Sequence, residues 1–265
     1  MKILCIGDVC GSVGCNALLR LLPRIKRERA VDFVVVNGEN SADGNGITAE
    51  SISSVFAAGA DVVTGGNHSF RRQESYSLLD ENEFLLRPEN ITDTPFGRGY
   101  CLVDCGRYSV AVMNLLGVIG LEKLGATSPF EAADTLIERA KADGAGIILV
   151  DFHAEATSEK RALGIYLDSK VSAVFGTHTH VLTADAQVLP NGTGYITDLG
   201  MTGSVQSVLG VRSDIIIERL RSKNMQKFVL ADGPCYINGC IFEIDEKSGR
   251  CLSAECITVY EEAQK

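Results

Sequence analysis

All four histidines of this 265-residue chain lie just after apolar runs, and other metal-ligating residue types accompany them. Asp8 and the pair Glu39-Asn40 follow two further apolar runs in the same way. In an open α/β sheet, loops at the carboxyl ends of the strands converge on one crevice, so five such loops can bring these side chains together. The candidate ligands are carboxylates, amides and imidazoles: Asp8, Glu39, Asn40, Asn67, His68, His153, His178 and His180. Together they predict a metal site with oxygen and nitrogen ligands.

The number and type of these groups indicate more than one ion. Imidazole and amide ligands together with two carboxylates favour iron, manganese or zinc over magnesium, which prefers oxygen and water. Two ions that share Glu39 would clamp the attacking and leaving oxygens of a phosphoryl transfer. His178 and His180, two residues apart, can serve adjacent ions when the loop turns between them. The pattern therefore predicts phosphoester chemistry on two transition-metal ions.

Each of these residues also has a structural explanation when it is taken alone. Asp8 or Glu39 after a strand is commonly a helix cap. Asn40 and Asn67 beside glycines can supply turn geometry, and His153 can be a histidine satisfied in the core. All of these explanations would have to hold at once, and the five similar segments argue against that.

Two other signatures do not account for these residues. Gly7, Gly11 and Gly14 lie near the first apolar run, but their spacing is not that of the Gly-x-Gly-x-x-Gly dinucleotide loop. Asp8 would also repel a pyrophosphate at that position. The sequence contains no Gly-x-Ser-x-Gly elbow of a serine hydrolase.

Length, charge and cysteine usage predict a single soluble domain over residues 1–265. The net charge of −9 argues against an extended nucleic-acid surface, which needs clustered lysine and arginine. No stretch approaches the roughly 18 apolar residues of a membrane span, so no membrane partner is expected. The nine cysteines include no Cys-x-x-Cys and lie mostly in apolar runs, which predicts buried free thiols and a cytoplasmic location. The sequence leaves a homo-oligomer open.

The elements that must position the site alternate between apolar runs and helical patterns. Buried strands are expected at Lys2–Ile6, Asp32–Val36, Asp61–Val63, Gly146–Val150 and Val171–Phe175. Helical spacing covers Val13–Arg29, Thr48–Ala58 and Pro129–Ala142, with Thr48 and Ser128 as N-caps. This alternation predicts a mostly parallel sheet with both faces covered.

Other segments have antiparallel character. Two hairpins are expected, one from Tyr100–Asp104 and Tyr108–Met113 and one from Ala186–Leu189 and Gly194–Thr197. Three further strands are expected at Gln226–Ala231, Tyr236–Ile244 and Cys251–Val259. We expect this later half to build a second sheet.

The strings around the candidate ligands resemble the signatures of calcineurin-like metallophosphoesterases. The closer similarity is to the bacterial YmdB-like branch of that superfamily. It rests on longer strings at residues 151–160, 176–181, 183–185 and 195–203, and it runs from residue 1 to about 245. The resemblance implies an α/β fold arranged as a four-layer α/β/β/α sandwich.

The resemblance also implies a role for each candidate. One ion would lie on Asp8, Glu39, Asn40 and His180, and the other on Glu39, Asn67, His153 and His178. His68 is then a catalytic residue that binds no metal. Cys10 stands where the wider superfamily has a histidine, and it is either a thiolate ligand or a small buried side chain lining the site. Ser69-Phe70-Arg71 departs from the Thr-Trp-Asp of relatives, which affects substrate contacts near His68.

For activity, the resemblance implies a cyclic nucleotide substrate, with 2',3'-cyclic AMP favoured. The expected mechanism is hydrolysis of the phosphodiester by a metal-bridging hydroxide, with His68 as the general acid. The expected cofactors are two divalent or trivalent transition-metal ions, with iron favoured over manganese and zinc. The residues leave two alternatives open: a phosphomonoesterase or protein phosphatase on the same ions, and a regulatory RNA-associated protein whose phosphodiesterase activity is slow and secondary.

Overall fold

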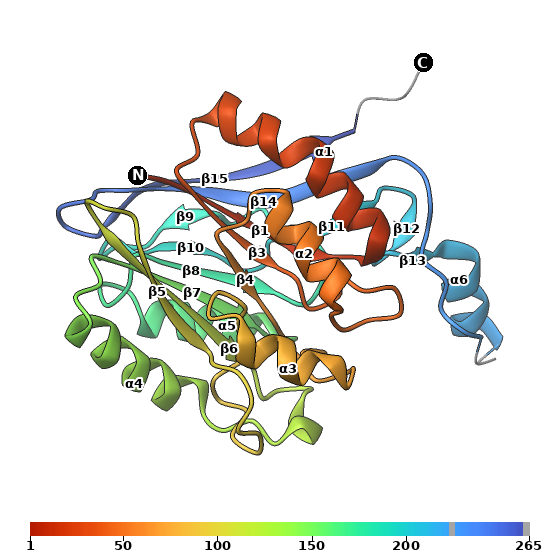
Figure 1. The fold of residues 1–265 in the computed structure, drawn as a ribbon, viewed down its shortest axis with the longest axis horizontal. Coiled ribbons are helices and arrows are strands. Elements are labelled where there is room, and N and C mark those ends of the chain that lie inside the picture. The colour runs from red at the N-terminus through yellow and green to blue at the C-terminus, as the bar shows by residue number, and fades with distance from the viewer. Residues whose placement is uncertain (223–225, 262–265) are drawn as a thin grey trace.

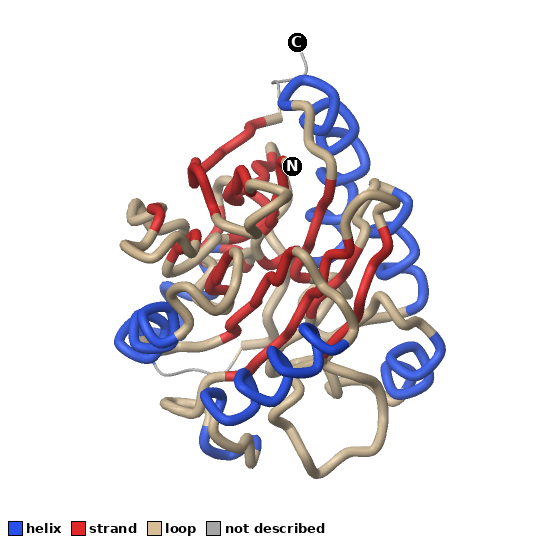
Figure 2. Tube along the Cα trace, turned by 90° about the vertical axis from the view of Figure 1, so that its left-hand side faces the viewer, coloured by secondary structure: helices blue, strands red, loops and turns tan. Residues whose placement is uncertain are grey.

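Two β-sheets stack face to face at the centre of the protein, with helices on their outer faces (Figures 1 and 2). The computed structural model describes residues 1–222 and 226–261. Within these residues no helix is long and apolar enough to cross a membrane.

The first sheet is mixed and has seven strands. They are β1 (Lys2–Ile6), β2 (Asp8–Val9), β3 (Phe33–Asn37), β4 (Val62–Thr64), β11 (Met201–Ser204), β14 (Cys235–Ile244) and β15 (Cys251–Tyr260). Strands β1, β3 and β4 run parallel, whereas β14 lies antiparallel to β1 and to β15. The carboxyl ends of β1, β3 and β4 therefore meet at one edge.

The second sheet has six strands. They are β5 (Tyr100–Asp104), β6 (Ser109–Leu116), β7 (Ile147–His153), β8 (Ala173–Thr177), β9 (Gln187–Val188) and β10 (Gly194–Ile196). Strands β6, β7, β8 and β10 are parallel, and the two expected hairpins, β5–β6 and β9–β10, are antiparallel. The prediction of both hairpins is confirmed.

Helices cover the outer face of each sheet, which gives four layers. Helices α1 (Gly11–Arg29), α2 (Ala49–Ala57) and α3 (Glu74–Glu81) pack on the first sheet. Helices α4 (Pro129–Ala142) and α5 (Thr157–Tyr166) pack on the second. A short 3-10 helix, η1 (Glu122–Leu124), precedes α4. The α/β/β/α prediction is confirmed.

Strand β1 shows why the predicted strands read as continuous apolar runs. Side chains alternate across a strand, so Ile3 and Cys5 point into the core between the sheets, and Leu4 and Ile6 point toward the helices. All four side chains are fully buried. A strand with both faces buried needs apolar residues at every position.

Helix α2 begins with two reciprocal hydrogen bonds between Thr48 and Ser51. The Thr48 hydroxyl accepts from the Ser51 N–H at 3.2 Å, and the Ser51 hydroxyl accepts from the Thr48 N–H at 3.0 Å. Serine thus closes the reciprocal capping box that usually uses glutamate or glutamine. The N-cap of α4 at Ser128 is also confirmed, with Pro129 in the first turn.

One prediction about the sheets is wrong. Strands β14 and β15 do not extend the second sheet, because β14 pairs with β1 and so joins the first. Each sheet has helices on one face only, since its other face packs on the partner sheet. Both faces of each sheet are covered, as predicted.

A small extension follows β11 at the end of the first sheet. It contains β12 (Ser207–Val208), β13 (Val211–Arg212) and α6 (Ser213–Ser222), which Figure 1 shows beyond the edge of that sheet. The strand expected at Gln226–Ala231 is wrong, because only Leu230 makes an isolated bridge there, with Val211. That segment instead lies against the β12–β13 hairpin. The predicted free cysteines are confirmed, and seven of the nine are buried.

Candidate metal centre

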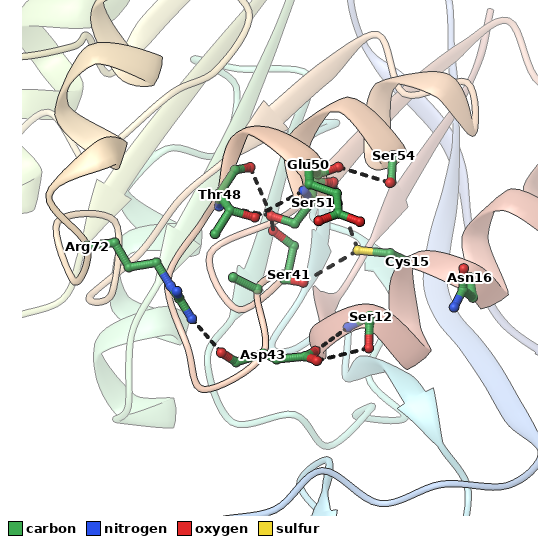
Figure 3. Close-up of a pocket in the computed structure, with 11 residues that line it drawn as sticks. Ser12, Cys15, Asn16, Ser41, Asp43, Thr48, Glu50, Ser51, Ser54 and Arg72 are labelled. Atoms are coloured by element: carbon green, nitrogen blue, oxygen red, sulfur yellow. Dashed lines mark hydrogen bonds between the residues drawn. The ribbon is translucent and has the colours of Figure 1, made fainter.

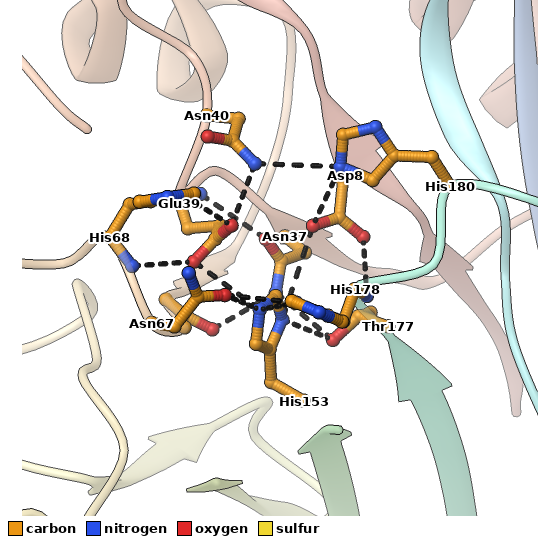
Figure 4. A network of polar contacts seen from close by, with 12 residues as sticks. Asp8, Asn37, Glu39, Asn40, Asn67, His68, His153, Thr177, His178 and His180 are labelled. Atoms are coloured by element: carbon orange, nitrogen blue, oxygen red, sulfur yellow. Dashed lines mark hydrogen bonds and ion pairs between the residues drawn. The ribbon is translucent and has the colours of Figure 1, made fainter. Parts of the chain in front are cut away.

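The candidate ligands converge at the carboxyl ends of strands from both sheets (Figure 4). Asp8 follows β1, Glu39 and Asn40 follow β3, and Asn67 follows β4. His153 ends β7, and His178 and His180 follow β8. The convergence expected of five loops is therefore observed, although it draws on two sheets rather than one.

Four donor atoms form a tight set in this cluster. Asn67 Oδ1 lies 2.8 Å from His153 Nε2 and 2.9 Å from His178 Nδ1. The two ring nitrogens are 3.0 Å apart, and Glu39 Oε2 is 3.3 Å from His153 Nε2. Metal–ligand bonds near 2.1 Å place neighbouring donors about 3 Å apart around one ion. We call Glu39, Asn67, His153 and His178 the tight set.

The structure fixes which nitrogen of His153 is free. Thr177 Oγ1 donates to Asp151 Oδ1 at 2.7 Å, so it accepts from His153 Nδ1 at 2.9 Å. Nδ1 therefore carries the proton, and Nε2 presents a lone pair to the tight set. Burial also lowers the pKa of His153 to about 4, which keeps the ring neutral near pH 7. A neutral ring of this tautomer is the form that binds metal.

His178 and His180 are held in the same way as His153. His178 Nε2 lies 2.9 Å from Glu155 Oε2, which leaves Nδ1 for the tight set. His180 Nδ1 lies 3.2 Å from the Leu209 carbonyl oxygen, so Nε2 is the nitrogen that faces Asp8. Each histidine thus has one nitrogen occupied by an acceptor and one available for a ligand bond.

A second group, Asp8, Asn40 and His180, is spaced more widely, and we call it the loose set. His180 Nε2 is 3.6 Å from Asp8 Oδ1 and 3.4 Å from Asn40 Nδ2. Asn40 Nδ2 also donates to Glu39 Oε1 at 2.6 Å. Because the amide nitrogen faces this set, a ligand bond from Asn40 requires its amide to turn over. Turning the amide over would also point Asn40 Oδ1 toward the site. Within the described residues this buried oxygen has no hydrogen-bond partner.

The buried carboxylates fit a cation. Asp8 and Glu39 are at most 1% exposed, and a cluster of ligand atoms from Asp8, Glu39 and His153 lies within 4.8 Å. Burial alone would raise both pKa values, but His180 and His153 hold the pKa of Asp8 well below its usual range, and His153 and His68 lower that of Glu39. Within residues 1–222 and 226–261, Asp8 Oδ1 has no hydrogen-bond partner. Two buried negative charges of this kind need a metal or another compensating charge.

His68 lies beside the two sets rather than inside them. Its backbone N–H donates to Glu39 Oε2 at 2.9 Å, and its Nδ1 is 3.1 Å from Glu39 Oε1. Its Nε2 is 3.4 Å from Asn45 Nδ2. The side chain is 29% exposed and lines a cavity of about 400 Å³ that opens onto both sets. This position suits a residue that contacts substrate rather than metal.

Cys10 is buried against the loose set. Its Sγ lies 3.6 Å from His180 Nδ1 and 3.7 Å from the carbonyl oxygen of Asp8. Nδ1 is the nitrogen that faces the Leu209 carbonyl, whereas Nε2 faces Asp8 Oδ1. The thiol therefore lies beside the ring nitrogen that is turned away from Asp8, which favours a small buried side chain over a ligand.

Comparison with known proteins gives the family. The chain matches the YmdB-like protein family over residues 4–257. The chain belongs to this family. It is 41% identical over 259 residues to the 2',3'-cyclic-nucleotide 2'-phosphodiesterase of Bacillus subtilis (strain 168), covering 98% of this chain and 97% of that protein. The expected resemblance to the YmdB-like branch is confirmed.

Solved structures support the same placement. The crystal structure of a phosphatase from Mycoplasma pneumoniae has a TM-score of 0.92 at 31% identity, covering 99% of this chain and 94% of that one. The calcineurin-like phosphoesterase YfkN of Bacillus subtilis has a TM-score of 0.62 at 13% identity, covering 98% of this chain and 90% of that one, and shares the fold. This YmdB-like protein is a phosphoric ester hydrolase of the phosphodiesterase/phosphatase class with a calcineurin-like fold.

Sequence reasoning missed the carboxylate beneath the tight set. Asp151 is fully buried in β7 and accepts from Asn37 Nδ2 at 3.0 Å, Thr64 Oγ1 at 2.5 Å and Thr177 Oγ1 at 2.7 Å. Burial raises the pKa of Asp151 to about 7, although these hydrogen bonds lower it. Its position between the apolar residues Val150 and Phe152 was the available signal, because a carboxylate inside a buried strand needs partners.

A buried ion pair supports the loop between the site histidines. Lys160 is 1% exposed, and its Nζ donates to the equally buried Asp198 at 2.6 Å. Asp198 also accepts from the Thr179 N–H at 3.1 Å, so it fixes the residue between His178 and His180. The Thr202 carbonyl oxygen accepts from the Cys10 N–H at 2.9 Å.

A polar cluster near the starts of α1 and α2 fixes the loop that carries Asn40 and Asn45 (Figure 3). Asp43 accepts from the Ser12 N–H at 2.7 Å. Arg72 donates to the carbonyl oxygens of Asp43 and Asn45. These groups line part of a cavity of about 340 Å³.

Proposed function

We propose that this protein is a dinuclear metal-dependent phosphodiesterase that hydrolyses 2',3'-cyclic nucleotides, with 2',3'-cyclic AMP as the favoured substrate. The observation that carries the proposal is that Glu39, a member of the tight set, also contacts the loose set. Its Oε2 lies 3.3 Å from His153 of the tight set, and its Oε1 lies 2.6 Å from Asn40 of the loose set. One carboxylate can therefore serve both ions.

The residues that would hold the two ions are those of the two sets. Asp8, Glu39, Asn40 and His180 would hold one ion, and Glu39, Asn67, His153 and His178 the other. Iron is favoured, and manganese and zinc suit the same nitrogen and oxygen ligands. When bound, the ions supply positive charge that neutralises the phosphate and lowers the pKa of the attacking water.

His68 would transfer the proton to the leaving oxygen. Glu39 Oε1 accepts from His68 Nδ1 at 3.1 Å, which leaves Nε2 to carry the transferred proton. The His68 side chain lines the cavity, so Nε2 is within reach of a substrate bound there. Protonation of the leaving oxygen by a positioned side chain contributes roughly 10²–10⁴-fold to the rate.

The substrate class follows from the similarity to the Bacillus subtilis enzyme. That protein is named for cleavage of the 2' ester of a 2',3'-cyclic nucleotide. On this chain the leaving oxygen would then be O2' of the ribose, and the product would carry a 3'-phosphate. His68 is the residue we assign to protonate O2'.

A panel of substrates tests the proposal. Manganese- or iron-loaded protein is offered 2',3'-cyclic AMP, p-nitrophenyl phosphate and a short RNA, and kcat/KM is measured for each. We expect the cyclic nucleotide to give the highest value. Preference for the monoester would instead support a phosphomonoesterase, and slow turnover of all three would support a regulatory protein with secondary activity.

A further inference from the structure

The cavity above the candidate metal centre has two unlike sides. One side carries the polar groups Glu39, Asn40, His68, His178 and His180. The other side is an apolar wall made by Val208, Leu209, Val211, Ile216, Phe228 and Leu230. A phosphate needs only the first side, so the wall indicates that the substrate has a second, apolar part.

The wall comes from the small extension that follows β11. Its β12–β13 hairpin lies against the segment 228–231, because the Arg212 N–H donates to the Val229 carbonyl at 3.0 Å and the Ala231 N–H donates to that of Gly210 at 3.0 Å. Ile216 adds a side chain from α6. Residues far from the metal-ligand motifs thus complete the cavity.

Specific contacts fix this wall relative to the metal centre. The Leu209 carbonyl oxygen lies 3.2 Å from His180 Nδ1. The Leu230 side chain packs directly on Gly11, where an added Cβ would lie 2.2 Å from Leu230 Cδ1. Gly11 follows Cys10, which contacts His180. The apolar side is therefore held at a set position beside the loose set.

Two side chains of the wall remain open to solvent. Leu209 is 48% exposed and Phe228 is 46% exposed, although both line a concave site. The Arg219 guanidinium lies 4.7 Å from the centroid of the Phe228 ring and adds a cation–π contact to it. An apolar ligand that covers these side chains removes their surface from water, and this burial contributes favourable free energy to binding.

We propose that Phe228 and Leu209 form the binding surface for the nucleobase of the substrate. This inference rests on the proposed phosphodiesterase function, because it places the cyclic phosphate at the metal centre and the base against the wall. A cavity of about 400 Å³ is of the size that takes a small ligand. Stacking on an aromatic ring tolerates every base, so the wall selects for the presence of a base rather than its identity.

Two substrates that differ only in the base separate this inference from the function itself. They are 2',3'-cyclic AMP and methyl β-ribofuranoside 2',3'-cyclic phosphate, which keeps the ribose and the cyclic phosphate. We expect wild-type protein to prefer the nucleotide, and Phe228→Ala to lower its kcat/KM roughly 5- to 100-fold, mainly through KM. The base-free substrate should be turned over equally by both proteins.

Two further variants serve as controls. Ile217→Ala truncates a residue of α6 that is 52% exposed and does not line the cavity, and it should leave both substrates unchanged. Phe228→Tyr keeps the ring and should retain the preference for the nucleotide. Equal kcat/KM for the two substrates in wild type, or an equal loss for both in Phe228→Ala, would overturn the base-binding role alone. Wild-type turnover of neither substrate would overturn the proposed function and this inference with it.

Discussion

The tight and loose sets differ in the spacing of their donor atoms and in the anchoring of one histidine of each, His153 and His180. His153 is fully buried, and side chains inside the sheets, Thr177 and Asp151, hold its ring. The His180 side chain is 12% exposed, and the carbonyl of Leu209 in the β12–β13 turn holds its ring. Donor spacing follows the same order, 2.8–3.3 Å in the tight set and 3.4–3.6 Å in the loose set. The His178 side chain of the tight set is 18% exposed, so donor spacing and the buried anchor of His153 distinguish the two sets, and we expect the tight set to retain its ion more strongly.

The largest effect should come from Glu39, the carboxylate that we assign to both ions. We expect Glu39→Ala to lose both ions, or to leave one loosely held, and to abolish phosphodiesterase activity. Elemental analysis of the purified variant and of wild type gives the number of ions per chain. A fully loaded wild type with at most one ion per chain would end the dinuclear proposal.

Removing one histidine from each set tests the comparison directly. We expect His153→Ala to lose the ion of the tight set together with activity. His180→Ala should weaken only the ion of the loose set, so that one ion per chain survives dialysis. Anomalous scattering at the metal edge locates the remaining ion in each variant. Retention of the loose-set ion after loss of the tight-set ion under the same dialysis would reverse the order proposed above.

His68 lies outside both sets, so its removal should separate chemistry from metal binding. We expect His68→Ala to keep both ions and to lower kcat roughly 10²-fold or more, because the lost interaction acts mainly in the transition state. Metal content and kcat for 2',3'-cyclic AMP are measured on the same sample. An emptied site would show that His68 is a ligand, and an unchanged kcat would remove its role as general acid.

The smallest expected effect concerns the support beneath the tight set. Thr177→Val removes the hydroxyl that accepts from His153 Nδ1, and we expect metal affinity at the tight set to fall roughly 10–100-fold. Competition with a chelator measures this affinity without any substrate. Thr64→Val is the matched control, since it removes a similar hydroxyl from Asp151 without touching His153. Equal losses in the two variants would assign the effect to Asp151 packing instead.

The sequence predicted what depends on local pattern. Strand β1 and helix α4 have the predicted bounds, and the candidate ligands meet because each follows the carboxyl end of a strand. The assignment of particular ligands to two ions stays a prediction, as do the single domain over residues 1–265, the homo-oligomer and the cytoplasmic location.

Features that depend on distant partners were not predictable in this way. Strand β14 joins the first sheet because it pairs with β1, more than 230 residues earlier in the chain. Lys160 is buried because Asp198, 38 residues away, balances its charge. The apolar wall at Phe228 was not predictable from the sequence. Its segment has a strand-like pattern, and nothing local links it to the metal centre.

The candidate ligands are divided between the two sheets, so metal binding at the proposed centre would be coupled to folding. The oxygen ligands Asp8, Glu39, Asn40 and Asn67 come from the first sheet, and the histidines of the two sets come from the second. An ion bound to both groups ties the two halves of the sandwich across their interface. Because the unfolded chain does not assemble this group, each bound ion would add its binding free energy to the native state, about 2.7 kcal/mol when free metal is at 100 times Kd. The melting temperature of the protein would then report the free metal concentration, independently of any catalysis.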